Sequence, residues 1–268
     1  MIPKEMNFFW SGSPMSFLRY MTLHSFRMFN PDWKMRLWTC PVKPDATWNS
    51  GEKTDSVDYR GKDYGDKAAG LDIELREVDL PLKDLPPAYA CDLCEWKVLS
   101  ELGGWFSDMD ILYRKPMPEI DNDVDVVLCY ERSCLGIGLL AGSINNQVWN
   151  NVYRVAIQEN KTNNNYQACG VHAIYRAYSF TNTVRAMNRV HPDLIIECLS
   201  NATVYPFDCS KLQLVWASPT KLPDSVIGIH WFGGYHESQK YNNRINQNNY
   251  RDFNCTISSV LSEIGCNL

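Results

Sequence analysis

The chain has 268 residues, 45% of them hydrophobic and 21% charged, which is the composition of a globular protein with a sizeable core. Its formal net charge of −5 argues against nucleic acid or an anionic membrane as a partner, because both bind clustered Lys and Arg. No segment reaches the roughly twenty apolar residues of a transmembrane helix, and the apolar segment 6–10 is too short for a signal peptide. We therefore expect a cytoplasmic protein whose cysteines are reduced.

Strand and helix patterns alternate from the first residues onward. A strand is expected at 6–10, followed by a helix at 15–29 whose apolar residues recur at three- and four-residue spacing, and by a second strand at 33–38. Residues 41–70 are polar and rich in Asp, Lys and Gly, which indicates a long loop or an irregular insertion. A third strand is expected at 72–78.

The next helix is expected at 88–102, and it is apolar almost all round, so it should be buried. Gly103 and Gly104 end it in the manner of a helix C-cap. The remaining expected elements are strands at 105–107, 124–130, 135–141 and 226–230, and helices at 148–157, 171–190 and 253–264. This alternation predicts an α/β fold, with a central, mostly parallel sheet flanked by helices, in one domain that spans residues 1–268.

Two carboxylates directly follow the strand expected at 105–107. Asp108 and Asp110 are two residues apart, so on an extended chain both side chains point the same way. Open α/β sheets bind ligands at the carboxyl ends of their strands. Carboxylate oxygens suit Mg²⁺ or Mn²⁺, and such an ion leaves coordination positions for substrate phosphates. The pair therefore predicts a metal that offsets the charge of a departing diphosphate, as the donor of a sugar transfer requires.

An Asp-x-Asp pattern is weak when it stands alone. Asp121, Asp123 and Asp125 repeat the same spacing, and there a polar turn that leads into a strand is the better interpretation. What distinguishes Asp108 and Asp110 is their context, which is a buried helix, two glycines and an aromatic strand.

This context resembles a known family. The resemblance is carried by CDLCEW at residues 91–96 and by GGWFSDMD at residues 103–110. Together they are similar to the DXD-containing sugar-binding region of Och1-like mannosyltransferases, α-1,4-galactosyltransferases and, more distantly, clostridial glucosylating toxins. Ile2-Pro3-Lys4 with Phe9-Trp10 is similar to the opening strand of that family, and Gly228-Ile229-His230-Trp231 is similar to its closing His-Trp segment.

The resemblance implies a GT-A fold, a nucleotide-diphosphate sugar donor, Mn²⁺ or Mg²⁺, and retention of anomeric configuration. By position, Asp110 would bind the metal directly, and Asp108 would hold the ribose or sugar of the donor or reach the metal through water. Asp92 would hydrogen-bond sugar hydroxyls, and His230 would be a third contact to the metal or diphosphate. The nucleotide-sugar-binding part would be about 1–120 and the acceptor-side part about 121–268.

Further positions are implied or altered by the same comparison. Trp10 would line the pocket for the nucleotide base, and Trp231 would belong to a lid over the donor. Glu95 stands where the family usually has Arg, and Phe106 replaces the usual Tyr. Glu131 is a candidate for contact with the acceptor or the sugar, and a solvated charge is the alternative interpretation.

The sequence thus predicts a retaining glycosyltransferase that moves a hexose from a UDP- or GDP-sugar to a hydroxyl of a glycan or glycolipid acceptor. Two alternatives stay open. Glu95 favours a nucleotide-sugar hydrolase or a degenerate transferase, because a cation expected near the diphosphate is absent. The nine Trp residues and the acidic balance are also compatible with a non-catalytic glycan-binding module of the same fold.

Overall fold

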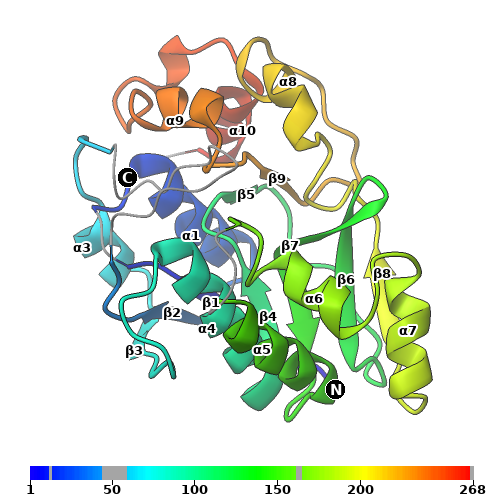
Figure 1. The fold of residues 1–268 in the computed structure, drawn as a ribbon. Coiled ribbons are helices and arrows are strands. Elements are labelled where there is room, and N and C mark those ends of the chain that lie inside the picture. Colours follow the sequence, from blue (N-terminus) through cyan, green and yellow to red (C-terminus); the bar gives the residue numbers. More distant parts are fainter. Residues whose placement is uncertain (12–13, 44–58, 161–164, 266–268) are drawn as a thin grey trace.

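A seven-stranded sheet runs through the centre of the protein (Figure 1). The computed structural model describes residues 1–11, 14–43, 59–160 and 165–265. The strand order is β3-β2-β1-β4-β7-β6-β8. The strands are β1 (Glu5–Phe9), β2 (Lys34–Thr39), β3 (Glu74–Glu77), β4 (Gly104–Ser107), β6 (Val126–Glu131), β7 (Cys134–Gly142) and β8 (Ile196–Leu199).

Of the seven strands of this sheet, β7 alone is antiparallel to its neighbours. β1 pairs in parallel with β2 and β4, β2 with β3, and β6 with β8, whereas β7 is antiparallel to both β4 and β6. β7 reverses because a tight hairpin joins it directly to β6, and a short connection of this kind can produce only an antiparallel neighbour. The predicted α/β class with a mostly parallel sheet is confirmed.

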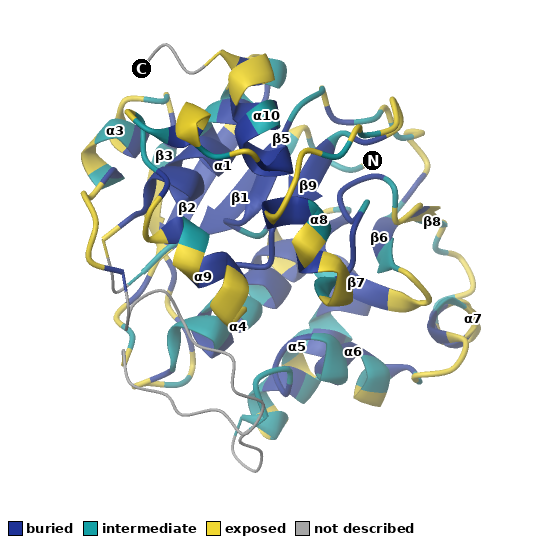
Figure 2. Ribbon diagram, turned by 90° about the horizontal axis from the view of Figure 1, so that it is seen from above, coloured by how far each residue is buried: buried dark blue, intermediate teal, exposed yellow. Residues whose placement is uncertain are grey.

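Helices cover both faces of the sheet, and they turn their buried sides inward (Figure 2). Successive residues of β4 point to opposite faces, so Trp105 enters one apolar core and Phe106 the other. The first core lies under α1, and the second lies under α4 and α5, where Trp96 stacks on Trp149 at 5.5 Å. The helices are α1 (Phe17–Phe29), α3 (Gly65–Ala69), α4 (Pro87–Glu101), α5 (Gln147–Glu159), α6 (Val171–Ala177), α7 (Thr183–Val190), α8 (Leu212–Trp216), α9 (His236–Asn242) and α10 (Thr256–Ile264), with 3-10 turns at Cys209–Lys211 and Tyr250–Asp252.

A second, two-stranded sheet fixes the position of the later site residues. β5 (Ile111–Tyr113) pairs in antiparallel fashion with β9 (Gly228–His230), so that Ile111 lies opposite His230. The strand expected at 226–230 exists, but it pairs with β5 and does not join the central sheet. This pairing brings the segment around His230 back to the end of β4.

Several expectations from the sequence need correction. The helix expected at 171–190 is two helices, because Ser179 and Asn182 adopt positive φ angles of 141° and 69° that interrupt helical geometry. The sequence pattern also missed β5, β8, α8 and α9, which are short and lack a clear apolar period. Half of the loop expected at 41–70, residues 44–58, lies outside the described residues, and α3 occupies part of the rest. No helix of the described residues is long and apolar enough to cross a membrane.

Gly103 joins the buried helix α4 to the central strand β4, and its φ angle is +66°. A Cβ atom there would lie 2.7 Å from the carbonyl oxygen of Gly142. Since both the left-handed backbone and the contact disfavour a side chain, we expect Gly103→Ala to lower the free energy of unfolding by about 2–4 kcal/mol in urea titrations. Gly265 has a similar φ of +71°, and none of the described atoms lies within 4 Å of the position that a Cβ atom would take, so Gly265→Ala should cost only about 1 kcal/mol. Equal losses in the two variants would refute the steric contribution.

Candidate active site

The end of β4 and the start of β5 hold two carboxylates over the same side of the sheet. The Asp108 amide donates to the carbonyl of Gly138 on β7 at 2.9 Å, and the carbonyl of Asp110 accepts from the Trp231 amide at 2.9 Å. Met109 between them is buried in the first core. This alternation turns the side chains of Asp108 and Asp110 the same way, as their spacing predicted.

His230 lies between these carboxylates, although it is more than 100 residues away in sequence. Its Nε2 atom is 3.3 Å from Oδ2 of Asp108 and 3.2 Å from Oδ1 of Asp110. Its ring is held by Tyr205 and Phe232, whose ring centroids lie at 5.0 Å and 4.4 Å. The imidazole is therefore positioned by its surroundings and not by the carboxylates alone.

Asp110 is 6% exposed and lies among positive and hydrogen-bond-donating groups. The Gly233 amide donates to its Oδ2 atom at 2.6 Å, and the Arg19 guanidinium lies 3.6 Å away. Burial alone would raise the pKa of Asp110, but the charges of His230 and Arg19 outweigh it and hold this pKa well below the usual range. For His230, burial alone would lower the pKa, but the two carboxylates raise the pKa of His230 to about 10.

The three side chains have the spacing of a metal site. One ligand atom from each of Asp108, Asp110 and His230 lies within 4.8 Å of the other two. The Oδ1 atom of Asp110 is buried and has no hydrogen-bond partner among the described residues, although it lies at ion-pair distance from His230. Two carboxylates with one imidazole fit Mn²⁺, and an all-oxygen site would be more typical of Mg²⁺.

Gly138 on β7 makes room for this group. A Cβ atom on it would lie 2.8 Å from Oδ2 of Asp108 and 2.9 Å from Cδ2 of His230. The Gly138 amide also donates to the Tyr205 hydroxyl at 2.8 Å, which holds that ring beside His230. A side chain at this position would fill the space that an ion and its ligands need.

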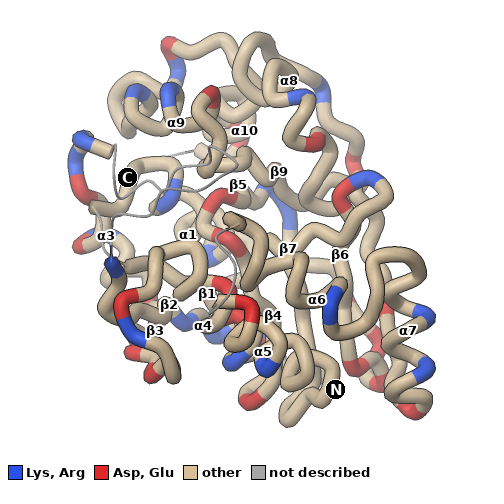
Figure 3. The backbone as a smooth tube through the Cα atoms, in the orientation of Figure 1, with Lys and Arg blue, Asp and Glu red and all other residues tan. Residues whose placement is uncertain are grey.

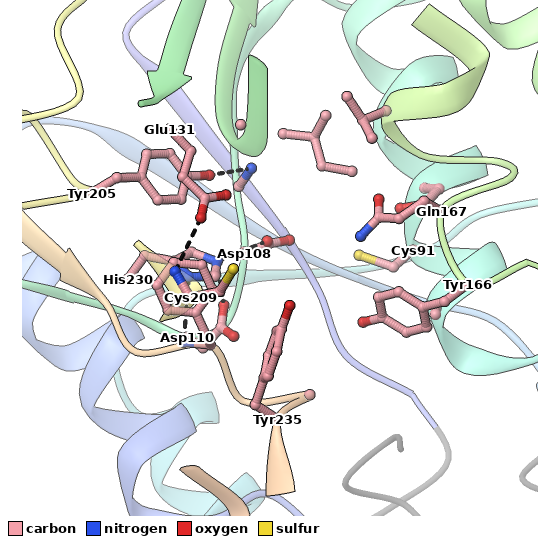
Figure 4. Close-up of a pocket in the computed structure, with 18 of the residues that line it drawn as sticks. Cys91, Asp108, Asp110, Glu131, Tyr166, Gln167, Tyr205, Cys209, His230 and Tyr235 are labelled. Atoms are coloured by element: carbon pink, nitrogen blue, oxygen red, sulfur yellow. Dashed lines mark hydrogen bonds and ion pairs between the residues drawn. The ribbon is translucent and has the colours of Figure 1, made fainter. Parts of the chain in front are cut away.

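The carboxylates open into a cleft of about 210 Å³ between the sheet, α4 and the loop after β9. Figure 4 shows Asp108, Asp110 and His230 on one side of it, and Cys91, Tyr166 and Gln167 on the other. Acidic positions lie along α4 and before β5 (Figure 3), and the described residues that line the cleft include no Lys or Arg. The lining residues that carry ionisable or hydroxyl groups are Cys91, Asp92, Asp108, Asp110, Glu131, Tyr166, Tyr205, Cys209, His230 and Tyr235.

Of the site residues predicted from the sequence, some line the cleft and two do not. Asp108, Asp110 and His230, called here the metal-type group, line the cleft. Asp92 lines it from α4, and Glu131 lines it from the end of β6. The Glu131 carboxylate accepts a hydrogen bond from the Cys209 amide at 3.1 Å, so it is more than a solvated charge. Trp10 and Trp231 are not among the lining residues.

Both tryptophans instead contact Arg19 of α1. The Arg19 guanidinium carbon lies 4.7 Å from the ring centroid of Trp231 and 5.4 Å from that of Trp10. Trp231 is fully buried, and from its loop it is Phe232 and Tyr235 that face the cleft. Sequence reasoning missed Arg19, and the signal that could have found it is a charged residue inside the apolar run 17–21 of a buried helix.

Glu95 lies on α4 and is 1% exposed. Among the described residues its Oε1 atom has no hydrogen-bond partner. Burial first, and then the negative charges of Asp108 and Asp92, raise the pKa of Glu95 well above its usual range. The position where the resembling family has a cation therefore holds a buried acid.

This burial predicts a pH dependence of stability. A carboxyl whose pKa is raised by folding binds its proton more tightly in the folded chain, so its contribution to stability falls as the pH rises above the unfolded pKa of 4.5. Gln cannot titrate, so we expect the Tm of Glu95→Gln relative to the wild type to be higher at about pH 8 than at about pH 5. Thermal unfolding monitored by circular dichroism measures this difference in Tm at each pH. The exposed neighbour variant Glu101→Gln should show no such trend, and a pH-independent difference for Glu95→Gln would contradict the burial argument.

Comparisons with known proteins give structural neighbours only. No known family profile matches the chain, and neither does any curated protein. Among solved structures, the chain is similar to the PaToxG glycosyltransferase, with 13% identity, a TM-score of 0.48, and coverage of 72% of this chain and 75% of that one. It is also similar to the galactosyltransferase LgtC in complex with donor and acceptor sugar analogues, with 11% identity, a TM-score of 0.42, and coverage of 92% and 99%.

A third neighbour is the glycosyltransferase domain of the YGT toxin, with 10% identity, a TM-score of 0.46, and coverage of 74% and 80%. These neighbours are glycosyltransferases of the GT-A fold. Overlaps at this level do not establish a shared activity, so the function of this chain has to follow from the residues of its own cleft.

Proposed function

We propose that the protein is a retaining glycosyltransferase that moves a hexose from a UDP- or GDP-sugar to a hydroxyl of a glycan or glycolipid acceptor. The single observation that carries this proposal is the group formed by Asp108, Asp110 and His230 in the lining of a cleft beside the central sheet. A sugar diphosphate is the ligand that such a group suits, because its leaving diphosphate gains negative charge and the cleft has no Lys or Arg of its own among the described lining residues.

Asp108, Asp110 and His230 would hold Mn²⁺ or Mg²⁺. When bound, the ion supplies positive charge against the diphosphate. Arg19 and the Gly233 amide fix the orientation of the Asp110 carboxylate, so this ligand is already in place before the donor arrives. Because the pKa of His230 is raised, its Nε2 atom must release a proton to coordinate a cation.

The other residues of the cleft orient the substrates in this proposal. Asp92 on α4 lines the same cleft as Asp108, Asp110 and His230 and would accept hydrogen bonds from sugar hydroxyls. Tyr235, at the start of α9, and Phe232 border the cleft and would help to exclude water, which would otherwise hydrolyse the donor. Residues of about 1–120 would bind the nucleotide sugar, and those of about 121–268 the acceptor.

Retention of configuration is proposed without an enzymic nucleophile. Apart from Asp108 and Asp110, the described residues that line the cleft include two carboxylates, Asp92 and Glu131. The Glu131 carboxylate accepts a hydrogen bond from the Cys209 amide. In the retaining enzymes that the sequence resembles, the acceptor attacks from the same face as the leaving group, and a phosphate oxygen takes its proton. Glu131 then serves as a contact for the acceptor or the sugar.

A hydrolase, or a degenerate transferase, is the alternative that one observation favours. Glu95 removes the cation that the resembling family places near the diphosphate, and no described lining residue replaces it. Weak control of the leaving group would allow water to compete with the acceptor.

Asp110→Asn should abolish metal-dependent nucleotide binding. The substitution removes a charged ligand atom while it keeps the shape of the side chain, so the affinity for UDP or GDP in the presence of Mn²⁺ should fall about 100-fold or more. Isothermal titration calorimetry with each nucleotide, with and without Mn²⁺, measures this. The matched control is Asp123→Asn, which alters the exposed second Asp-x-Asp and should leave the affinity unchanged. Undiminished affinity of Asp110→Asn, or a wild type that binds neither nucleotide, would refute the metal-site proposal.

Transfer and hydrolysis can be separated by following the donor itself. We expect the wild type with Mn²⁺ to release nucleotide diphosphate faster when glycan acceptors are added, because a hydroxyl acceptor replaces water in the cleft. Proton NMR of the first product formed should show the anomeric configuration of the donor. A release rate that no acceptor increases would support the hydrolase, and an inverted anomer would exclude the retaining mechanism.

A further inference from the structure

A second cavity, of about 720 Å³, lies between the β6–β7 hairpin, α6 and α7 (Figure 1). We call it the hairpin groove. Tyr130 of β6 and Tyr175 of α6 line it, together with Phe180 in the connection between α6 and α7, and Asn188 on α7. Its volume falls within the roughly 300–1,000 Å³ that sites for small molecules occupy. The groove is thus large enough to hold a ligand of its own.

The hairpin groove continues the candidate active-site cleft. Leu135 of β7 lines both of them. Val171 lines the cleft from the start of α6, and Tyr175, four residues later, lines the groove; side chains at this spacing share one side of a helix. One helical turn is about 5.4 Å, which is comparable to the length of one sugar unit. The Tyr175 hydroxyl also accepts a hydrogen bond from the Leu135 amide at 3.2 Å, so the wall shared by the two cavities is fixed.

Phe180 is an exposed aromatic ring on the wall of this groove. It is 65% exposed, and its ring lies edge-on to that of Tyr175, with the centroids 4.8 Å apart. The backbone on either side holds it there, because Ser179 and Asn182 adopt positive φ angles and the Thr183 hydroxyl donates to the Ser179 carbonyl at 2.7 Å. Such conformations cost energy in residues other than glycine, and they are frequent in segments that bind ligands. The outward position of Phe180 is therefore specified by the turn that carries it.

The rest of the lining consists mainly of uncharged groups that can form hydrogen bonds. Ser133 contributes a hydroxyl, and Asn182 and Asn188 contribute amides. Among the described residues that line the groove, Arg185 is the one charged side chain, and there is no carboxylate. This lining suits a neutral ligand better than a polyanion or a cation. A sugar unit has the matching chemistry, since the C–H groups of its ring pack against an aromatic side chain and its hydroxyls bond to amides and hydroxyls.

A protein partner fits the groove less well. Among the described lining residues, Phe180 alone is a largely exposed apolar side chain. Protein interfaces are marked by contiguous apolar patches, whereas this ring stands among hydroxyl and amide groups. The arrangement favours a small polar ligand with one apolar face.

We propose that the hairpin groove binds the second sugar unit of the acceptor, so that the acceptor is a glycan of at least two units with an uncharged second unit. This inference rests on the proposed function, since it specifies the acceptor of that reaction. The reacting unit lies in the cleft beside Leu135, and the next unit packs on Phe180 and bonds to Asn182 and Asn188. The groove belongs to the part of the chain, about 121–268, that is proposed to bind the acceptor.

The test measures the affinity for free glycosides. The probes are the methyl glycosides of neutral disaccharides built from glucose, galactose and mannose in α and β linkages, each compared with the methyl glycosides of its two component sugars. NMR titrations are run without nucleotide, and again with Mn²⁺ and UDP or GDP. We expect at least one disaccharide to bind about tenfold more tightly than both of its components in one of these conditions, because an aromatic contact and new hydrogen bonds are added.

Phe180→Ala should reduce this ratio of affinities to about one, whereas misfolding would lower the affinities for both kinds of glycoside together. Asn188→Ala, which changes another exposed residue of the groove, should also reduce the ratio. The matched control is Leu75→Ala, because Leu75 is 61% exposed but lies on β3, at the other edge of the sheet from β8. The control should keep the ratio of the wild type. Circular dichroism shows whether each variant is folded.

Two results of these titrations would overturn the inference: no preference for any disaccharide in the wild type under either condition, or an unchanged ratio in Phe180→Ala. Sedimentation provides a further check. A dimer of this chain that is lost in Phe180→Ala would assign the exposed ring to an interface between two copies and would also overturn the inference.

The two proposals can fail separately. Calorimetry with UDP and GDP involves no sugar acceptor, so Mn²⁺-dependent nucleotide binding without a disaccharide preference would leave the transferase standing and remove the groove from the acceptor site. A disaccharide preference that depends on Phe180, without nucleotide binding, would refute the transferase and leave a protein that binds glycans through the hairpin groove.

Discussion

The arrangement of the whole cleft depends on how three ionisable side chains share one small volume. Asp108 and Asp110 would repel each other if nothing stood between them, and His230 with Arg19 neutralises that repulsion. Buried ion groups of this kind rarely stabilise a protein strongly, because desolvation offsets most of the attraction. The metal-site proposal accounts for their presence at the end of a central strand, because a cation would take the place of the histidine proton.

Packing contacts and hydrogen bonds surround this group of side chains. Trp10 and Trp231 contact Arg19, Arg19 contacts Asp110, and the Gly233 amide fixes the second oxygen of Asp110. The Tyr205 ring packs against His230, and its hydroxyl accepts a hydrogen bond from the Gly138 amide. The tryptophans that the family resemblance associates with base and lid thus contribute here, through Arg19, to the orientation of the Asp110 carboxylate.

The acidic side of the cleft raises a different question of energetics. Asp92 and Glu95 on α4 weaken the folded state at neutral pH, because burial and mutual repulsion both disfavour their charged forms. Asp92 lines the cleft, whereas Glu95 lies buried on the same helix where the resembling family usually has an arginine.

Local sequence was sufficient for the parts of the fold that depend on neighbours along the chain. The apolar helix α4, the glycines after it and the Asp-x-Asp spacing could be read directly, because helical period, φ > 0 and strand alternation are short-range properties. The pairing of β5 with β9, which brings His230 to Asp108, depends on contacts between segments more than 100 residues apart. The roles of Arg19 and Trp231, and the burial of Glu95, were likewise decided only by packing, since no local pattern specifies which distant side chain will cover a charge.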